Sequence, residues 1–315
     1  MYLKNIFFFV LFIVSISSCM KEEVPKPKYG ETSTATKTLE MGEDYGNLLG
    51  FSLLNDDVYT VESMKWDLFF YPDLSVRLNG SRFMKAQQLP NLDAFSDSEV
   101  DSNFVFDSFS TSSSNLVVKL NADTSFYRID LGRDLAGAVL GRKDVLFIKN
   151  ENEISIHHRL KGEINWKIQT LKVNSSQGLF YSFLNENNFT NPIFTESEFY
   201  CGGYTIRFEN QNLDYLVRGV LKNKDVKVEI LELNQANYSE IGLEDIVGKS
   251  FSDTVDVIGY DWKTFDIDAS LYHVDQNKVF ILRYDSGLVF KLHFLSYYNS
   301  VGVKGSSLFE YELLE

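Results

Sequence analysis

The sequence is poor in cysteine, with Cys19 and Cys201 as its two cysteines in 315 residues. Cys19 stands at the end of an apolar N-terminal run, so Cys201 is left as the cysteine in the body of the chain. A single cysteine cannot form an intrachain disulfide, and two cannot complete a tetrahedral sulfur site for zinc. We therefore expect Cys201 to be a small buried hydrophobic residue.

Positive charge is also in short supply. The chain has 30 lysines and arginines against 44 aspartates and glutamates, which gives a formal net charge of -14. An acidic protein without a basic stripe repels phosphates, and this argues against nucleic-acid binding. The sequence also lacks the G-x-S-x-G and H-E-x-x-H motifs and a phosphate-binding loop. We therefore expect that the protein is not an enzyme.

The longest apolar run is at the N-terminus. Lys4 precedes a stretch from Ile6 to Ile16 that is broken only by Ser15, and small residues then lead to Cys19. The stretch is shorter than the ~20 residues that a transmembrane helix needs, and its arrangement is typical of a secretory signal peptide. Ile-Ser-Ser-Cys resembles a bacterial lipobox, in which the cysteine thiol receives a diacylglycerol. We predict a signal peptide over residues 1–18 and lipidation of Cys19.

The residues after Cys19 predict where the protein is displayed. Two or three acyl chains, at ~0.8 kcal/mol per buried CH₂, hold a protein firmly on a membrane. Lys21-Glu22-Glu23 resembles a surface-export signal of some Gram-negative lipoproteins. Residues 19–43 are polar, with prolines near their start, and are typical of a flexible tether. We expect a protein that is lipid-anchored to the outer membrane and exposed at the cell surface.

Beyond residue 43 the hydrophobic period is mostly two, which predicts β-strands. In residues 163–168, Ile164, Trp166 and Ile168 alternate with polar residues. The phase changes near Gln169, where a β-bulge would account for it. Further strands are expected over residues 116–120, 126–131, 145–148, 154–156, 226–233, 279–284, 288–295 and 308–314. A short turn with Gly287 between two of them predicts a hairpin.

Helical patterns are scarce and short. Ser239–Val247 and Leu135–Leu140 are the two candidates, whereas 26 phenylalanines and 17 tyrosines suit the broad apolar faces of sheets. We predict an all-β fold, mainly antiparallel, built as a sandwich or half-open barrel with one or two short helices. Residues 44–315 would form a single β domain, with an elaborated middle region over about 146–233.

Two blocks of the sequence resemble the HmuY-like haem-binding lipoprotein family. The first is Lys65–Phe70 (KWDLFF) followed by Val76–Gly80 (VRLNG), and the family shows a Trp-Asp-hydrophobic strand that leads to an Arg-x-Asn-Gly turn. The second is Val279–Tyr298 (VFILRYDSGLVFKLHFLSYY), followed by a final aromatic strand. The residues that follow the family's terminal hairpin pattern are Arg283, Asp285, Gly287, Lys291, Ser296, Tyr297 and Tyr298, and Ser286 is one extra turn residue.

The resemblance implies an all-β protein that captures haem outside the cell for iron acquisition, without catalysis. It also implies that haem then passes to a TonB-dependent outer-membrane receptor. The motif residues themselves are expected to be structural. Trp66 would pack under the sheet, Arg77 and Asn79 would set a turn, and Tyr297 and Tyr298 would lie on opposite sides of a strand.

Haem capture needs one or two axial ligands, usually His or Met, in an apolar slot. Of the four histidines, His273 precedes the terminal hairpin, where a loop can overhang a pocket, and it is the first candidate. His157 and His158 are adjacent in a strand, so they face opposite sides and at most one can enter a shared pocket. Met84 follows the Arg-x-Asn-Gly turn and is a further candidate.

His293 shares a face with Lys291 in the terminal hairpin, and we expect it to be half-exposed on the sheet. No metal other than haem iron is expected. The alternative function is a β-sandwich adhesion or interaction module that binds protein or glycan at the cell surface. That alternative predicts an exposed aromatic patch without a pocket near a histidine or methionine.

Overall fold

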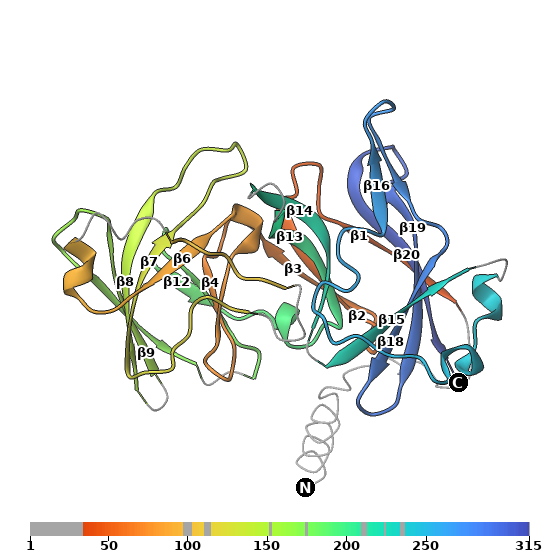
Figure 1. Cartoon of the computed structure of the whole chain (residues 1–315), viewed down its shortest axis with the longest axis horizontal. Helices are drawn as coiled ribbons and strands as arrows, with labels where there is room; N and C mark the ends of the chain where they lie inside the picture. Colours follow the sequence, from red (N-terminus) through yellow and green to blue (C-terminus); the bar gives the residue numbers. More distant parts are fainter. Residues whose placement is uncertain are drawn as a thin grey trace, which may run out of the picture. The chain divides into compact units, whose positions relative to one another are not determined.

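The computed structural model describes residues 34–96, 103–109, 115–150, 153–173, 176–208, 213–223, 225–233 and 237–314 (Figure 1). The predicted signal peptide, Cys19 and the first part of the tether lie outside these residues. Within the described ranges, the helical segments are 3₁₀ turns of at most four residues. None of the helices in this part of the chain has the length and hydrophobicity that crossing a bilayer requires.

The strands form four larger antiparallel sheets and a small hairpin, which confirms the all-β prediction. Sheet A has the order β1 (Ala35–Glu40), β20 (Lys304–Leu314), β19 (Val289–Tyr298), β18 (Lys278–Tyr284), β15 (Val226–Glu232). Sheet B has β14 (Leu213–Lys222), β13 (Phe199–Phe208), β2 (Asn47–Ser52), β3 (Asp57–Glu62). Sheet C has β12 (Asn187–Phe189), β11 (Leu179–Ser182), β4 (Leu68–Phe70), β5 (Val76–Leu78). Sheet D has β10 (Lys167–Lys172), β9 (Glu153–Leu160), β8 (Arg142–Lys149), β7 (Thr124–Asp130), β6 (Lys85–Leu89). The small hairpin pairs β16 (Lys263–Asp266) with β17 (Leu271–Val274).

Three apolar cores join the sheets in the order A, B, C, D. The first core contains Phe51 and Phe199 from sheet B and Phe309 from sheet A. The second joins sheets B and C and includes Trp66. The third joins sheets C and D and includes Phe147. Because each sheet contributes side chains to its neighbours, most strands are buried on at least one face, as aromatic-rich sheets require.

The predicted terminal hairpin is present. The Leu288 carbonyl accepts a hydrogen bond of 2.9 Å from Tyr284 N, and Gly287 closes the turn with a φ of 92° that only glycine adopts without strain. β19 continues to Tyr298 and pairs with β20 along most of its length. The sequence therefore locates this part of the core correctly.

The expectation for residues 163–168 was wrong. The strand there is β10 and begins only at Lys167, Ile164 is 86 % exposed, and the inward residue is Leu171. Trp166 lies against Phe95, with ring centroids 5.6 Å apart. β10 is the edge strand of sheet D, so a short alternating pattern can lie outside the core there.

Two other segments differ from the expectation. Residues 35–40, assigned to the tether, form β1 and pair with β20 from Ala35–Tyr311 to Glu40–Ser306. Their apolar residue, Leu39, is buried in the core between sheets A and B. The predicted helix over residues 239–247 is instead two 3₁₀ turns, Tyr238–Glu240 and Leu243–Ile246. These turns cover the outer face of sheet A, where Ile241 packs on Ile281 and its neighbours.

Candidate functional site

Asp67 of the Trp-Asp motif is half of a buried ion pair. Its Oδ1 pairs with Nη2 of Arg82, and each side chain is 3 % exposed. Its Oδ2 accepts a hydrogen bond of 2.6 Å from the backbone N–H of Phe183, just after β11. Asp67 therefore fastens the start of β4 to β11 and to the turn that carries Arg82.

Asn79 organises that turn, the 3₁₀ segment Gly80–Arg82. The Asn79 Oδ1 accepts from Ser81 N at 3.1 Å, and its Nδ2 donates to the carbonyls of Ser63 at 2.6 Å and Trp66 at 2.8 Å. The side chain is fully buried. We call Asp67, Asn79, Gly80 and Arg82 the turn anchor.

Glycine lets the turn anchor lie directly on β13. A Cβ on Gly80 would lie 3.2 Å from the Gly203 carbonyl, and a Cβ on Gly203 would lie 2.9 Å from Ser81 Cα. Backbone meets backbone at this contact, so neither side can yield as a flexible side chain would. The motif glycine and Gly203 thus serve packing between sheets.

Arg77 lies in a box of aromatic rings between sheets B and C. Its guanidinium carbon is 4.5 Å from the Phe109 centroid, 4.4 Å from Phe194 and 4.8 Å from Tyr200. Its Nη1 donates to the Tyr200 hydroxyl at 2.5 Å. Desolvated cation–π contacts of this kind are stabilising. Arg77 therefore holds sheets B and C together and does not set the turn, which was the role expected of it from the sequence; Asn79 does set the turn.

The terminal motif also makes structural contacts. Lys291 is buried, and its Nζ donates to the carbonyls of Tyr238 at 3.0 Å and Ile241 at 3.1 Å. The Tyr298 hydroxyl accepts a hydrogen bond of 2.7 Å from Tyr272 N. Lys291 therefore holds residues 237–251 on sheet A, and Tyr298 holds the β16–β17 hairpin.

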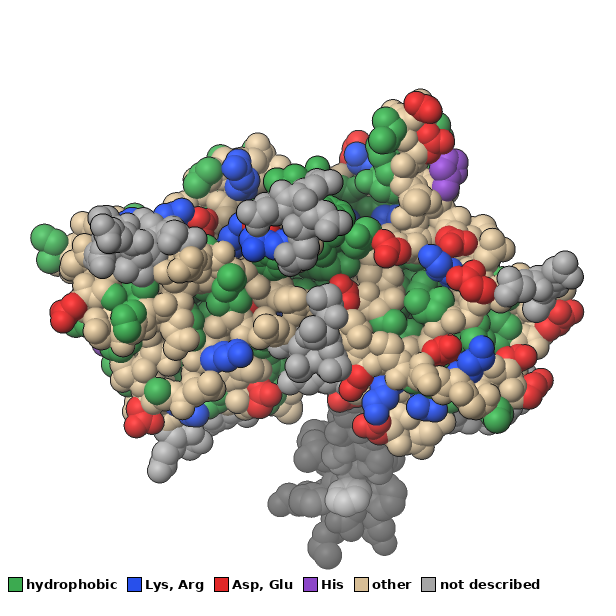
Figure 2. Space-filling model, viewed as in Figure 1, with side chains coloured by type: hydrophobic (Ala, Val, Ile, Leu, Met, Phe, Trp, Pro, Cys, Tyr) green, Lys and Arg blue, Asp and Glu red, His purple; other side chains and the backbone are tan. Residues whose placement is uncertain are grey.

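His273 lies on that hairpin, where β17 pairs it with Thr264. Its side chain is 61 % exposed, and its Nε2 is 3.7 Å from Asp266 Oδ2. Backbone N–H groups of Ala269 and Asp268 hold the pKa of Asp266 below its ordinary value. The ring of His273 is open to solvent, and Figure 2 shows histidine surface on the hairpin.

His157 and His158 lie on opposite faces of β9. His158 is fully buried, its Nδ1 is 3.3 Å from Lys143 Nζ, and its ring packs on Phe183. Burial, reinforced by Lys143, lowers the pKa of His158 to about 4. His157 is half-buried, between Leu146 on β8 and Ile168 on β10. His157 is thus the more accessible histidine of the two.

The low pKa of His158 makes stability depend on pH. Because the folded pKa is below the ordinary 6.5, the unfolded chain binds the proton first, and stability present above pH 6.5 is lost as the pH falls toward 4. Between pH 7 and pH 4.5 the wild-type protein should lose about 2 kcal/mol of its free energy of unfolding through His158. His158→Asn does not titrate, so its loss over the same pH range should be smaller by about that amount. Urea denaturation at the two pH values measures this difference. An equal pH dependence in both proteins would contradict the prediction.

Met84 and His293 are both held by the fold. Met84 is buried, and its Sδ accepts from Arg82 Nη2 at 3.4 Å, so a ligand could reach it only by opening the turn anchor. His293 is not half-exposed, as the sequence predicted, but buried. Its Nδ1 lies 2.9 Å from Glu310 Oε1, and Tyr238 stacks on its ring. The segment 237–251 covers this ring, and the sequence contains no signal for that cover.

The structure does not gather the four candidate ligands in one site. His273 is on the β16–β17 hairpin, His157 and His158 are in sheet D, and Met84 is beside the turn anchor. The two accessible candidates are His273 and His157. They come from different sheets, so each place offers a single accessible histidine, which is exposed at His273 and half-buried at His157.

A cavity of about 510 Å³, the hairpin cavity, opens beside β16 and β17. Its walls include Phe265, Tyr272 and Tyr298, with Lys304 also among the residues that line it. None of the residues that line it is a histidine or methionine. His273 neighbours Tyr272 on the strand, so its side chain lies on the opposite face of the hairpin. The aromatic pairs around Tyr272 were not recognised from the sequence.

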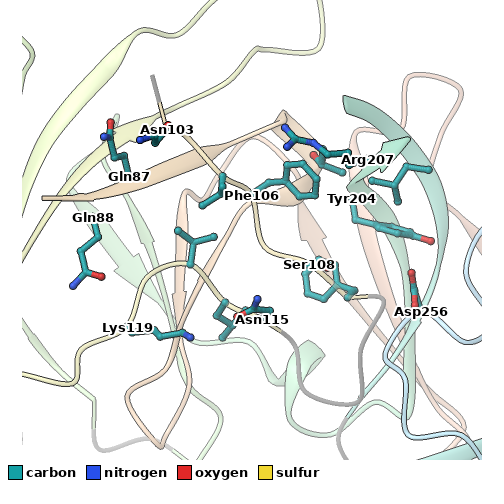
Figure 3. A pocket seen from close by; sticks show the side chains of 16 residues that line it. Gln87, Gln88, Asn103, Phe106, Ser108, Asn115, Lys119, Tyr204, Arg207 and Asp256 are labelled. Carbon is teal, nitrogen blue, oxygen red and sulfur yellow. The ribbon is translucent and has the colours of Figure 1, made fainter. Parts of the chain in front are cut away.

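A second cavity, of about 660 Å³, lies between β6 and β13 (Figure 3). We call it the β6–β13 cavity. Its lining is Gln87, Gln88, Asn103, Val105, Phe106, Ser108, Phe109, Asn115, Leu116, Val117, Lys119, Tyr204, Thr205, Ile206, Arg207 and Asp256. Sequence reasoning missed all of it, because its polar residues come from segments without a motif.

Comparison with known proteins identifies the family. The profile of the HmuY protein family matches residues 32–311, and no curated protein matches the chain. The chain is similar to apo PinO from Porphyromonas gingivitis, with a TM-score of 0.31, 7 % identity, and coverage of 90 % of this chain and 99 % of that chain. It is similar to an apo HmuY analogue (TFO) from Tannerella forsythia, with a TM-score of 0.29, 10 % identity and coverage of 90 % and 97 %. It is also similar to a HmuY-like protein from Bacteroides vulgatus, described as heme-binding, with a TM-score of 0.26, 11 % identity and coverage of 89 % and 91 %. TM-scores this low carry no conclusion, whereas the family profile spans most of the sequence. The chain therefore belongs to the HmuY family.

Proposed function

We propose that the protein binds haem, or a related flat apolar ligand, at the cell surface and does not transform it. Membership of the HmuY family over residues 32–311 carries this proposal. The two sequence blocks shared with haem-binding lipoproteins agree with it. A cavity with aromatic side chains in its wall, on the hairpin that also carries the exposed His273, supports it.

The hairpin cavity fits the apolar part of haem. Phe265 and Tyr272 pack against each other with ring centroids 4.9 Å apart, and Tyr298 closes the wall, so a flat ring system would meet aromatic faces. Lys304 would supply a positive charge for a propionate. The iron would need a ligand from outside the present lining. His273 on the same hairpin is our first choice, and its ring would have to turn from the opposite face of the hairpin toward the cavity.

The other candidates rank behind His273 for physical reasons. His157 is accessible, but it lines neither the hairpin cavity nor the β6–β13 cavity. His158 and Met84 are buried, so binding at either would require sheet D or the turn anchor to open. We keep His157 as the second candidate.

Anchoring completes the proposal. A signal peptide over residues 1–18 and a lipid on Cys19 would hold the protein in the outer membrane, facing outward. Bound haem would then pass to a TonB-dependent receptor for iron acquisition. Labelling with radioactive palmitate, lost in Cys19→Ala, tests the anchor, and protease accessibility on intact cells tests surface exposure.

Hemin titration of the purified mature domain tests ligand binding. We expect a saturable Soret band distinct from that of free hemin, and His273→Ala should move that band and weaken binding about tenfold or more. Phe265→Ala should weaken binding without moving the band, because it removes a wall and not an axial ligand. Phe208→Ala, an exposed aromatic on β13 outside the hairpin cavity, is the matched control and should bind as wild type.

The outcomes separate function from ligand assignment. A spectrum that stays that of free hemin would remove the proposed function. A bound spectrum that His273→Ala leaves unchanged would keep the function and move the assignment to His157, which His157→Ala then tests.

A further inference from the structure

Two buried polar groups of the β6–β13 cavity have no hydrogen-bond partner among the described residues. They are Gln87 Oε1 and Thr205 Oγ1. The residues are 7 % and 3 % exposed, respectively, and both line this one cavity. Leaving a buried polar group unpaired is destabilising. Such groups are rare in folded proteins, and their clustering at one cavity indicates that something else completes their hydrogen bonds.

The remaining walls are polar and contain more amides than charged groups. Gln88, Asn103 and Asn115 add amides that can both donate and accept. Arg207 is paired with Asp214 at 2.8 Å, and Asp214 also pairs with Lys85 at 2.6 Å, so the charge of Arg207 is compensated in part. Lys119 and Asp256 carry opposite charges. The amides favour a neutral polar occupant, whose groups can both donate and accept.

The cavity also has an apolar surface and a firm frame. Phe106 and Phe109 are among the residues that line it. The Asp107 carboxylate accepts hydrogen bonds from Leu78 N at 2.7 Å and Val117 N at 2.8 Å, which ties the two lining segments, residues 103–109 and 115–119, to β5. In Figure 3, Gln87 and Gln88 of β6 stand across the cavity from Tyr204 and Asp256. The site is therefore built before any ligand arrives.

We propose that the β6–β13 cavity binds a neutral carbohydrate of about disaccharide size. Sugar hydroxyls donate and accept at once, so they can satisfy the Gln87 carbonyl and the Thr205 hydroxyl together. The C–H face of a pyranose ring would pack on Phe106, and planar amides would bind the remaining hydroxyls. The cavity volume of about 660 Å³ lies within the range of small-molecule sites.

This site is separate from the hairpin cavity. The two share no lining residue, so the carbohydrate proposal does not rest on haem binding. The lining of the β6–β13 cavity contains no histidine and no methionine, and its polar walls suit a flat apolar ligand poorly.

Saturation-transfer NMR and calorimetry with four neutral disaccharides test the proposal on the mature domain. The probes are maltose, cellobiose, lactose and N,N′-diacetylchitobiose. We expect at least one to bind with a Kd of about 1 mM or tighter. Thr205→Val and Gln87→Leu should each weaken that binding about tenfold, since each leaves a sugar hydroxyl without its partner.

The same variants provide a second readout in stability. Thr205→Val replaces an unpaired buried hydroxyl by a methyl group of similar size, so its Tm should rise or stay level while sugar binding falls. Thr170→Val and Gln169→Leu on β10 lie outside the cavity and should leave sugar binding unchanged. Opposite effects on stability and affinity are not expected of residues that only support the fold.

Two results would overturn the proposal. One is the absence of saturable binding by all four disaccharides, which would mean that water alone fills the cavity. The other is loss of hemin binding, rather than sugar binding, in Thr205→Val and Gln87→Leu, which would assign the cavity to haem. Loss of sugar binding in both variants, with hemin binding the same as in wild type, supports the proposal. This result does not depend on whether hemin binds at the hairpin.

Discussion

Asp67→Ala is expected to lower the free energy of unfolding by about 3–5 kcal/mol. The substitution removes the partner of Arg82 and leaves a buried guanidinium without a compensating charge. It also leaves the backbone N–H of Phe183 without its acceptor. Urea denaturation at constant pH measures the loss, since urea does not screen the ion pair as guanidinium chloride would.

A surface pair is the control for this effect. Glu62→Ala removes the partner of Lys65, but those side chains are 57 % and 60 % exposed, so we expect a loss of less than about 1 kcal/mol. The double variant Asp67→Ala/Arg82→Met should recover part of the stability, because no buried charge then remains. A loss in Asp67→Ala no larger than in Glu62→Ala would show that the pair does not hold β4 in place.

Asn79→Ala should cost about 3 kcal/mol, for a different reason. It leaves the carbonyls of Ser63 and Trp66 and the N–H of Ser81 without partners in a fully buried place. Asn79→Asp should cost at least as much, since a carboxylate cannot donate to the two carbonyls and would face them with negative charge. Thermal and urea unfolding of the two variants measure these losses.

Asn191 offers a matched control for Asn79. It also caps a 3₁₀ turn, with Oδ1 accepting from Ile193 N at 3.0 Å and Nδ2 donating to the Thr60 carbonyl at 3.2 Å. It is half-exposed, so water can replace the lost bonds, and Asn191→Ala should cost about 1 kcal/mol. Equal losses at Asn79 and Asn191 would contradict the central role of the turn anchor.

The strand pattern could be predicted where two-residue periodicity coincides with burial. β18 and β19 are long, apolar on one face and joined by a Gly-containing turn, so their pattern and their position agree. Ile164 and Ile168 follow the same alternation, yet both are exposed. Periodicity reports that one face is apolar, but it does not report whether another sheet covers that face.

The roles of the motif residues could be predicted better than the cavities. Asn79 sets a short turn, whose contacts are local and whose residue types restrict the conformation. Arg77 instead lies in β5 and contacts rings far along the chain, which the motif did not predict. The β6–β13 cavity instead combines Gln87, Asn115 and Thr205, which are far apart in the sequence and carry no common pattern. His293 is covered by Tyr238 for the same reason: long-range packing decides its exposure.

The pairing of β1 with β20 brings residues from the two ends of the chain together. Thr34 Oγ1 donates to Glu312 Oε2 at 2.7 Å across 278 positions, and β1 is the edge strand of sheet A. β1 therefore lacks its neighbour in sheet A until the segment that forms β20 has been synthesised. Closing so large a loop is slow. The pairing of β1 with β20 is thus expected to be a late step of folding, and the hydrogen-bonding edge of β20 stays open in the interval.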